Sequence, residues 1–194
     1  MSILDILYGL IFQPQTAMRE LARTRPLLPA FLVFVTVYAA NYLLREAGRS
    51  ITQIETGLIP ASMAGLIAAL GAIAAIAVWF VSAGLFSLLA EIIYGYGNGR
   101  GVLACLGFAS FPGIFGSALY YLAILLNLNS WGMLFYVITV LWVIGLQVLA
   151  VREAFTLATA QAIFIYALPV VLFLAVIVML TVMGGIVLTS LPLF

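Results

Sequence analysis

The ionisable side chains of this sequence are few, and their types restrict the chemistry that the chain can perform. Seven arginines and six acidic residues are spread over 194 positions, and histidine and lysine are absent. Histidine is the commonest general base and a frequent ligand of metals, so the usual catalytic and metal sites cannot form. No serine, threonine or cysteine has a histidine to activate it. We therefore predict a chain that is not an enzyme, with no catalytic, cofactor-binding or metal-binding residues and no cofactor.

Glu91 is the carboxylate that lies inside an apolar run, so its depth in a membrane decides its role. An acid in the middle of a bilayer is costly and is a functional candidate by default. If its helix extends beyond the bilayer, Glu91 reaches the headgroups and can pair with arginines there. Two interpretations stay open, an ion or proton site and an interfacial charge cluster, of which we favour the second. The cluster would comprise Glu91, Arg100, Arg152 and Glu153.

The glycine-rich segment 94–101, YGYGNGRG, joins two apolar stretches. Loops that bind phosphate use glycine to expose backbone N–H groups, but this segment lacks the GxxxxGK[ST] pattern. We interpret it as a tight turn flanked by interfacial tyrosines. The net charge of +1 provides no basic patch, so nucleic acid is not an expected partner.

The elements that must position these residues follow from composition. Of all residues, 66% are hydrophobic and 7% charged, whereas soluble domains carry about 25% charged residues. Five apolar stretches each reach or exceed the roughly 18–20 residues that cross a bilayer core. We predict an all-α, polytopic transmembrane helix bundle that occupies residues 26–194. The expected membrane helices are 26–44, 60–94, 102–126, 131–151 and 162–188.

Residues 1–25 are expected to form amphipathic helices at the cytoplasmic membrane interface, before the first crossing. Residues 2–13 are apolar except along one line at helical spacing, which predicts a helix that lies in the interface. Pro14 fits the first turn of a second helix, where its missing N–H costs little. The apolar face of this second helix would comprise Ala17, Met18, Leu21 and Ala22.

The second apolar stretch, 60–94, is longer than one crossing requires. Its middle contains no turn residues for a hidden hairpin, so we predict one long helix that projects beyond the bilayer. Small residues recur along it at a spacing that lets helix backbones approach closely in lipid. We favour packing inside the bundle over self-association as their role. The residues concerned are Gly65, Ala69, Gly71, Ala75 and Gly84.

Two prolines lie inside the expected third and fifth helices. Pro112 and Pro169 each remove a backbone hydrogen bond and are expected to kink their helices. Broken helices can line transport sites, but bends without function are also tolerated in membranes. We interpret both kinks as structural.

The arginines indicate the orientation of the chain. Five crossings place five arginines on one side and only two, Arg45 and Arg49, on the other, which the positive-inside rule assigns to the outside. We expect a cytoplasmic N-terminus and a C-terminus on the opposite side, with the bacterial inner membrane as the location. The cytoplasmic arginines are Arg19, Arg23, Arg25, Arg100 and Arg152.

The order of these parts resembles the Yip1 domain family of five-helix membrane proteins. An early proline in 13–16, QPQT, precedes a first helix, a polar loop and a long second helix. Residues 94–112, YGYGNGRGVLACLGFASFP, are similar to the family's glycine-rich turn and its GY/F-x-x-x-P element. Residues 145–162, GLQVLAVREAFTLATAQA, resemble its connection into the last helix. The aspartate-leucine-x-glycine-proline motif of eukaryotic members is absent, so their association with Rab-type GTPases is not carried over.

Two hypotheses for function follow. The first is a non-catalytic membrane scaffold or accessory subunit of Yip1-like type, which packs against membrane protein partners, associates with itself or organises lipid. The alternative is a small transporter or channel for an ion or lipid, which would use Glu91 and the helices interrupted by proline. The identity of partners or substrate does not follow from the sequence.

Overall fold

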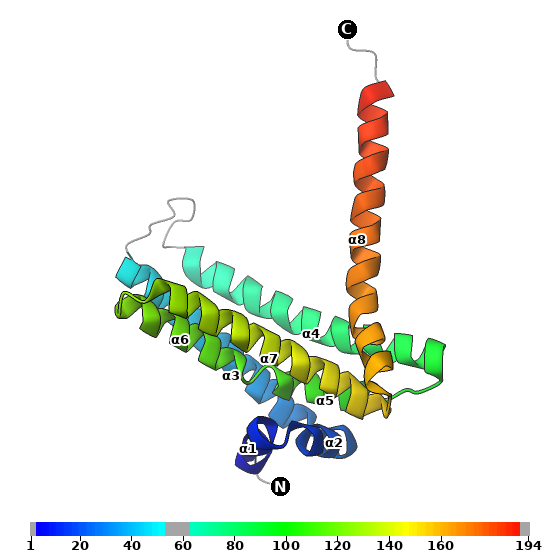
Figure 1. Ribbon diagram of the computed structural model, residues 1–194, viewed down its shortest axis with the longest axis horizontal. Coiled ribbons are helices and arrows are strands. Elements are labelled where there is room, and N and C mark those ends of the chain that lie inside the picture. Colours follow the sequence, from blue (N-terminus) through cyan, green and yellow to red (C-terminus); the bar gives the residue numbers. More distant parts are fainter. Residues whose placement is uncertain (1–2, 53–62, 191–194) are drawn as a thin grey trace.

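The computed structural model describes residues 3–52 and 63–190, and within these ranges the chain forms helices and no strand (Figure 1). The predicted all-α class is confirmed. The helices are α1 (Ile3–Phe12), α2 (Pro14–Thr24), α3 (Leu27–Thr52), α4 (Ala64–Tyr94), α5 (Gly99–Ala109), α6 (Gly113–Leu125), α7 (Asn129–Phe155) and α8 (Thr159–Ser190).

Five segments of the described chain are long and apolar enough to cross a membrane, as the sequence predicts. The protein is therefore a multi-pass integral membrane protein. The third segment combines α5 and α6, and each of the others is one helix. The long helix expected in the second stretch is confirmed as α4, a single helix of 31 residues. The segments are Leu27–Gly48, Gly65–Tyr94, Gly99–Leu125, Ser130–Phe155 and Thr159–Met183.

Several helix ends differ from their predicted positions, because those positions were set by hydrophobicity. α3 continues past residue 44 to Thr52, and α7 includes Arg152 and Glu153, which were expected in a loop. Arginine, glutamate and alanine are good helix formers, so a helix need not end where its apolar run ends. The predicted start of the second helix at residues 60–62 lies outside the described residues.

The third span is broken at Pro112 and not merely kinked as expected. Pro112 has no N–H to donate, and the neighbouring N–H groups bond to carbonyls only three residues back. The Phe111 N–H donates to the Phe108 oxygen at 3.1 Å, and the Gly113 N–H donates to the Ser110 oxygen at 2.9 Å. This tight turn separates α5 from α6. In contrast, α8 continues through Pro169 as one helix.

α5 is the most enclosed helix of the described chain. Eight of its 11 residues are buried, and it packs against α2, α3, α4 and α7. α3, α6 and α7 lie side by side, whereas α8 stands away from them and contacts α7 and α4 near its start (Figure 1). Only 6% of the fifth span's most apolar window is buried, compared with 50% for the third span. The bundle is therefore closed around α5 and open along α8.

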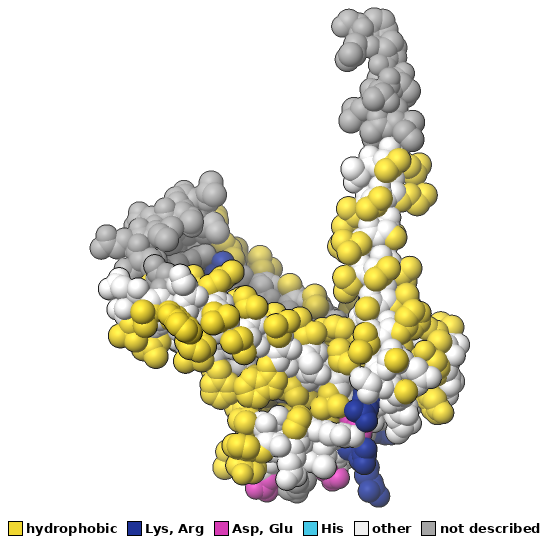
Figure 2. Space-filling model, in the orientation of Figure 1, with side chains coloured by type: hydrophobic (Ala, Val, Ile, Leu, Met, Phe, Trp, Pro, Cys, Tyr) yellow, Lys and Arg dark blue, Asp and Glu magenta, His cyan; other side chains and the backbone are white. Residues whose placement is uncertain are grey.

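The hydrophobic core lies at the end of the molecule where α1 and α2 cover the bundle. The predicted apolar face of α2 is confirmed, because Ala17, Met18, Leu21 and Ala22 are its buried residues. This face packs on α5 and α7. Figure 2 shows most of the dark blue and magenta charged surface of that view at the same end, with yellow apolar side chains over α8.

The small residues of α4 do not share the role expected of them. A Cβ atom added at Gly65 or Gly84 would meet no atom within 4 Å, so the favoured interpretation of internal packing fails at these two positions. Gly71 faces the Tyr38 hydroxyl of α3. Ala69 is exposed, and Ala75 lines a cavity between α4 and its neighbours. The outer face of α4 thus carries three exposed small residues, Gly65, Ala69 and Gly84.

Among the glycines of the described residues, Gly107 of α5 leaves the least room beside a neighbouring backbone: a Cβ atom there would lie 2.8 Å from the Ala30 carbonyl oxygen and 3.1 Å from Trp79. We predict that Gly107→Ala lowers stability by about 1–3 kcal/mol through overpacking, although alanine is otherwise the better helix former by about 1 kcal/mol. The thermal midpoint in detergent measures this change.

Gly145→Ala is the matched control, because a Cβ atom at Gly145 meets nothing within 4 Å. Its midpoint is expected to stay unchanged or to rise slightly. Equal midpoints for the two variants would show that α5 does not approach α3 as closely as described.

Candidate functional site

The turn between α4 and α5 is built by the glycine-rich segment. Gly95 adopts a left-handed conformation with φ of 74°, which costs glycine little. Its N–H donates to the backbone oxygen of Glu91 at 3.0 Å, which is the bond of an αL-type cap, and the Tyr96 N–H donates to the backbone oxygen of Ala90 at 3.3 Å. The chain then reverses and reaches Asn98, the N-cap of α5. The interpretation of this segment as a tight turn is in agreement with these bonds.

Asn98 connects three helices through one side chain. Its Oδ1 accepts a hydrogen bond from the Gly101 N–H at 3.2 Å, which caps α5. Its Nδ2 donates to the Ala22 oxygen at 3.3 Å and to the Ala154 oxygen at 3.0 Å. These carbonyls lie near the ends of α2 and α7, where helices leave acceptors without intrahelical partners. Asn98 therefore fixes α2 against the bundle as well as starting α5.

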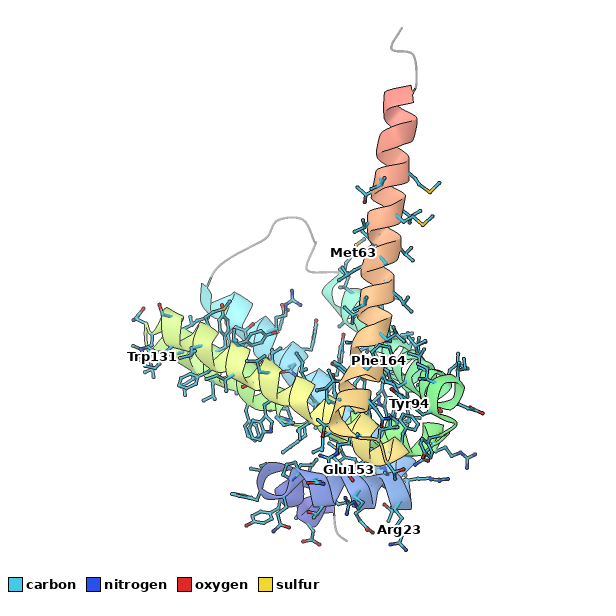
Figure 3. The ribbon with its side chains drawn as sticks, turned by 45° about the vertical axis from the view of Figure 1, so that its right-hand side comes forward. Arg23, Met63, Tyr94, Trp131, Glu153 and Phe164 are labelled. Atoms are coloured by element: carbon cyan, nitrogen blue, oxygen red, sulfur yellow. The ribbon has the colours of Figure 1, made fainter. Side chains whose placement is uncertain are left out.

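Glu153 provides the ionic contact of the same region. Its side chain is 6% exposed and accepts from Arg19 Nε of α2 at 3.0 Å, with Arg152 Nε 3.6 Å away. A buried carboxylate is costly unless it is paired, so Arg19 of α2 supplies the positive charge that Glu153 needs at the end of α7. Figure 3 shows Glu153 between α2 and the start of α8, whereas Arg23 points away from the bundle.

The thiol of Cys105 lies directly beneath α2. Its Sγ donates to the Met18 oxygen at 3.4 Å, and both residues are fully buried. Together, Arg19, Asn98, Cys105, Arg152 and Glu153 form what we call the α2 docking site.

The structure brings together only part of the predicted charge cluster. Arg152 and Glu153 are neighbours, but Glu91 and Arg100 are both exposed, and neither forms an ion pair among the described residues. The expected pairing of Glu91 is therefore wrong: its side chain is exposed in the last turn of α4 and forms no ion pair with Arg100 or Arg152. Glu153 instead pairs with Arg19, which lies 134 positions away in the sequence.

The two prolines occupy different surroundings. Pro112 is fully buried at the α5–α6 turn. Pro169 lines a cavity of about 410 Å³ between α4, α5 and α8, near Gln147 and Tyr166, whose hydroxyl donates to Gln147 Oε1 at 2.6 Å. Glu91 does not line this cavity or the two others described below.

The groups of the α2 docking site hold α2 against α5 and α7. The site contains carbonyl groups, one amide and an ion pair, and its thiol is enclosed. Within residues 3–52 and 63–190, no group of three metal-ligating side chains comes together. Sequence reasoning missed the roles of Asn98 and Arg19. An asparagine after a glycine turn and before a helix signals an N-cap, but nothing signals its contacts with α2 and α7.

We predict that Asn98→Ala releases α2. The Ala22 and Ala154 carbonyls lose their donor. If the free energy that holds α2 on the bundle falls by about 2 kcal/mol, the population with α2 detached rises about thirtyfold. Trypsin cleavage after the exposed Arg23 would accelerate by a similar factor, whereas the bond after Arg25 precedes Pro26 and resists trypsin.

Gln161→Ala is the control for this experiment. It removes a side-chain hydrogen bond to the Ala158 N–H at the same end of the bundle without touching α2. Cleavage of this variant should match that of the unmodified chain. If Asn98→Ala were cleaved no faster than Gln161→Ala, Asn98 would not hold α2.

Comparison with known proteins identifies one family. The model of the Yip1 domain matches residues 8–180, which include α2, all five spans in whole or in large part, and the glycine-rich turn. No curated protein and no solved structure matches the chain. The match covers most of the chain. The chain therefore belongs to the Yip1 domain family.

Proposed function

We propose that this protein is a non-catalytic membrane scaffold or accessory subunit that presents α8 and the outer face of α4 to the transmembrane helix of a partner. The observation that carries the proposal is the separation of α8 from the bundle. Every residue from Val170 to Met183 is exposed. A helix that leaves its own bundle has its whole surface available for contacts in the membrane.

The composition of α8 restricts what can cover it. Its sequence from Thr159 to Ser190 contains no charged residue. The surface that covers α8 must therefore be apolar, so it is either another membrane helix or lipid.

The small residues of α4 favour a helix over lipid. Small side chains at a membrane helix surface allow close backbone approach, which is how helices associate without a hydrophobic driving force. Gly65 and Gly84 are open on this face, and Ala69 is exposed between them. The partner can be a different membrane protein or a second copy of this chain.

The transporter alternative gains no support from Glu91. This carboxylate is exposed near the end of α4 and lines none of the three described cavities. The absence of histidine in the sequence and the enclosed thiol of Cys105 support a role without catalysis.

We also propose that the α2 docking site faces the cytoplasm of a bacterial inner membrane. Arg19, Arg23 and Arg25 belong to α2 or its end, Arg100 to the first turn of α5, and Arg152 to the last turn of α7. These three elements contact one another. The positive-inside rule assigns such an end to the cytoplasm.

A photo-crosslinking residue at Val176 of α8, which is 54% exposed, tests the proposal in native membranes. We expect a crosslinked membrane protein, or a species of twice the mass if the partner is a second copy. The same residue at Leu141 of α7 is the control, with 62% exposure on a helix without this small-residue neighbour. Adducts with lipid alone at both positions would contradict the proposal.

Gly84→Leu tests the part played by α4. If a partner helix packs on this face, the added side chain should reduce the Val176 crosslink about tenfold, which corresponds to about 1.4 kcal/mol of overpacking. Gly145→Leu adds the same side chain to an open position on α7 and should leave the yield unchanged. If neither variant changed the yield of the Val176 crosslink, α4 would not be part of the interface.

A further inference from the structure

A cavity of about 620 Å³ lies between α3, α6 and α7, on the part of the bundle far from α2. Its wall is mixed: Arg45 and Asn41 come from α3, and Ser117 comes from α6. Apolar side chains of α7, including Val140 and Val143, complete it. A smaller cavity of about 250 Å³ shares Asn41 and Arg45 with it. A pocket with one cation, hydroxyls and an apolar wall has the character of a site for an amphiphile.

The position of Arg45 along α3 matches the boundary of a bilayer. Arg45 follows the first residue of α3, Leu27, by 18 residues, or roughly 27 Å at about 1.5 Å per residue. The hydrocarbon core is about 30 Å thick. If Arg25 marks one headgroup layer, Arg45 reaches the other, and Asn41 lies one turn deeper.

Arg45 is available for an anion. It is exposed, and no carboxylate of the described residues lies within 4.0 Å of its guanidinium. A guanidinium offers five N–H donors in a fork that matches the oxygens of a phosphate. At the level of the headgroups, phosphate is the anion that lipids supply.

Asn41 provides the second polar contact. Its Oδ1 is buried and has no hydrogen-bond partner among the described residues. A buried amide oxygen without a partner is unfavourable, so an occupant that donates a hydrogen bond to it is favoured. Rotation of the amide by half a turn exposes N–H groups instead, which can donate to an ester carbonyl. Lipid ester groups lie deeper than the phosphate, as Asn41 lies deeper than Arg45.

We propose that this cavity binds an anionic phospholipid, with the phosphate on Arg45, the glycerol ester region beside Asn41, and an acyl chain along the exposed apolar face of α7. Tyr136 and Ile144 are exposed beside the cavity and extend this apolar face. The site is independent of any partner on α4 and α8. The apolar wall favours a lipid over free phosphate, which would leave that wall in water.

Native mass spectrometry of the purified full chain tests the site. After delipidation, phosphatidylglycerol, phosphatidylcholine with the same acyl chains and inorganic phosphate are offered separately. We expect retention of phosphatidylglycerol at about tenfold lower concentration than phosphatidylcholine, and no retention of inorganic phosphate. Equal retention of the two lipids, or retention of inorganic phosphate at the same concentration, would overturn the proposal.

Matched variants identify the residues. Arg45→Gln should weaken retention of phosphatidylglycerol about tenfold or more. Asn41→Leu should weaken it while preserving the preference for the anionic lipid. Arg100→Gln removes an exposed arginine at the other end of the molecule and should change nothing. If Arg45→Gln and Arg100→Gln retained the lipid equally, the site would not be at Arg45. Protection of Cys105 from thiol reagents confirms that each variant is folded.

Discussion

A helix that lies inside a membrane domain without access to lipid needs protein on every side, and α5 imposes this requirement on the rest of the fold. Three of its neighbours, α3, α4 and α7, are membrane spans, and the fourth is the amphipathic α2. Gly107 allows the backbone of α3 to approach, and Trp79 of α4 donates to the Leu103 oxygen at 3.2 Å. The N-terminal helices are therefore part of the core and not an appendage to it.

The same arrangement divides the molecule into a closed end and an open end. At the closed end, Asn98 and Glu153 fasten α2 with directional bonds, so the helix is held by more than apolar burial. At the open end, α8 from Val170 to Met183 and the outer face of α4 carry exposed apolar and small residues. This arrangement is consistent with a protein that is stabilised by packing at the α2 end and that contacts other molecules in the membrane through α8 and α4.

The sequence predicted features that follow from local pattern. The buried face of α2 could be predicted because apolar residues recur at helical spacing on one side of the helix and charged residues lie on the other. α4 could be predicted as one helix because its middle lacks turn residues. Features that depend on tertiary position could not be predicted. The bonds of Asn98 depend on where α2 and α7 end, and the pairing of Arg19 with Glu153 joins distant parts of the chain. The glycines of α4 and α5 look alike in sequence, yet Gly107 is enclosed and Gly84 is open.

α2 covers α5, and Cys105, the single cysteine of the chain, lies beneath α2 and can report whether this contact is present in the membrane. The measurement is the rate of reaction with a membrane-permeant maleimide in native membranes, before and after denaturation in sodium dodecyl sulfate. A second chain, with Cys105→Ser and Tyr96→Cys, places the thiol in the exposed α4–α5 turn as the control. With α2 docked, Cys105 is expected to react only after denaturation, whereas the thiol at position 96 reacts at once. Equal rates at the two positions in intact membranes would contradict a docked α2.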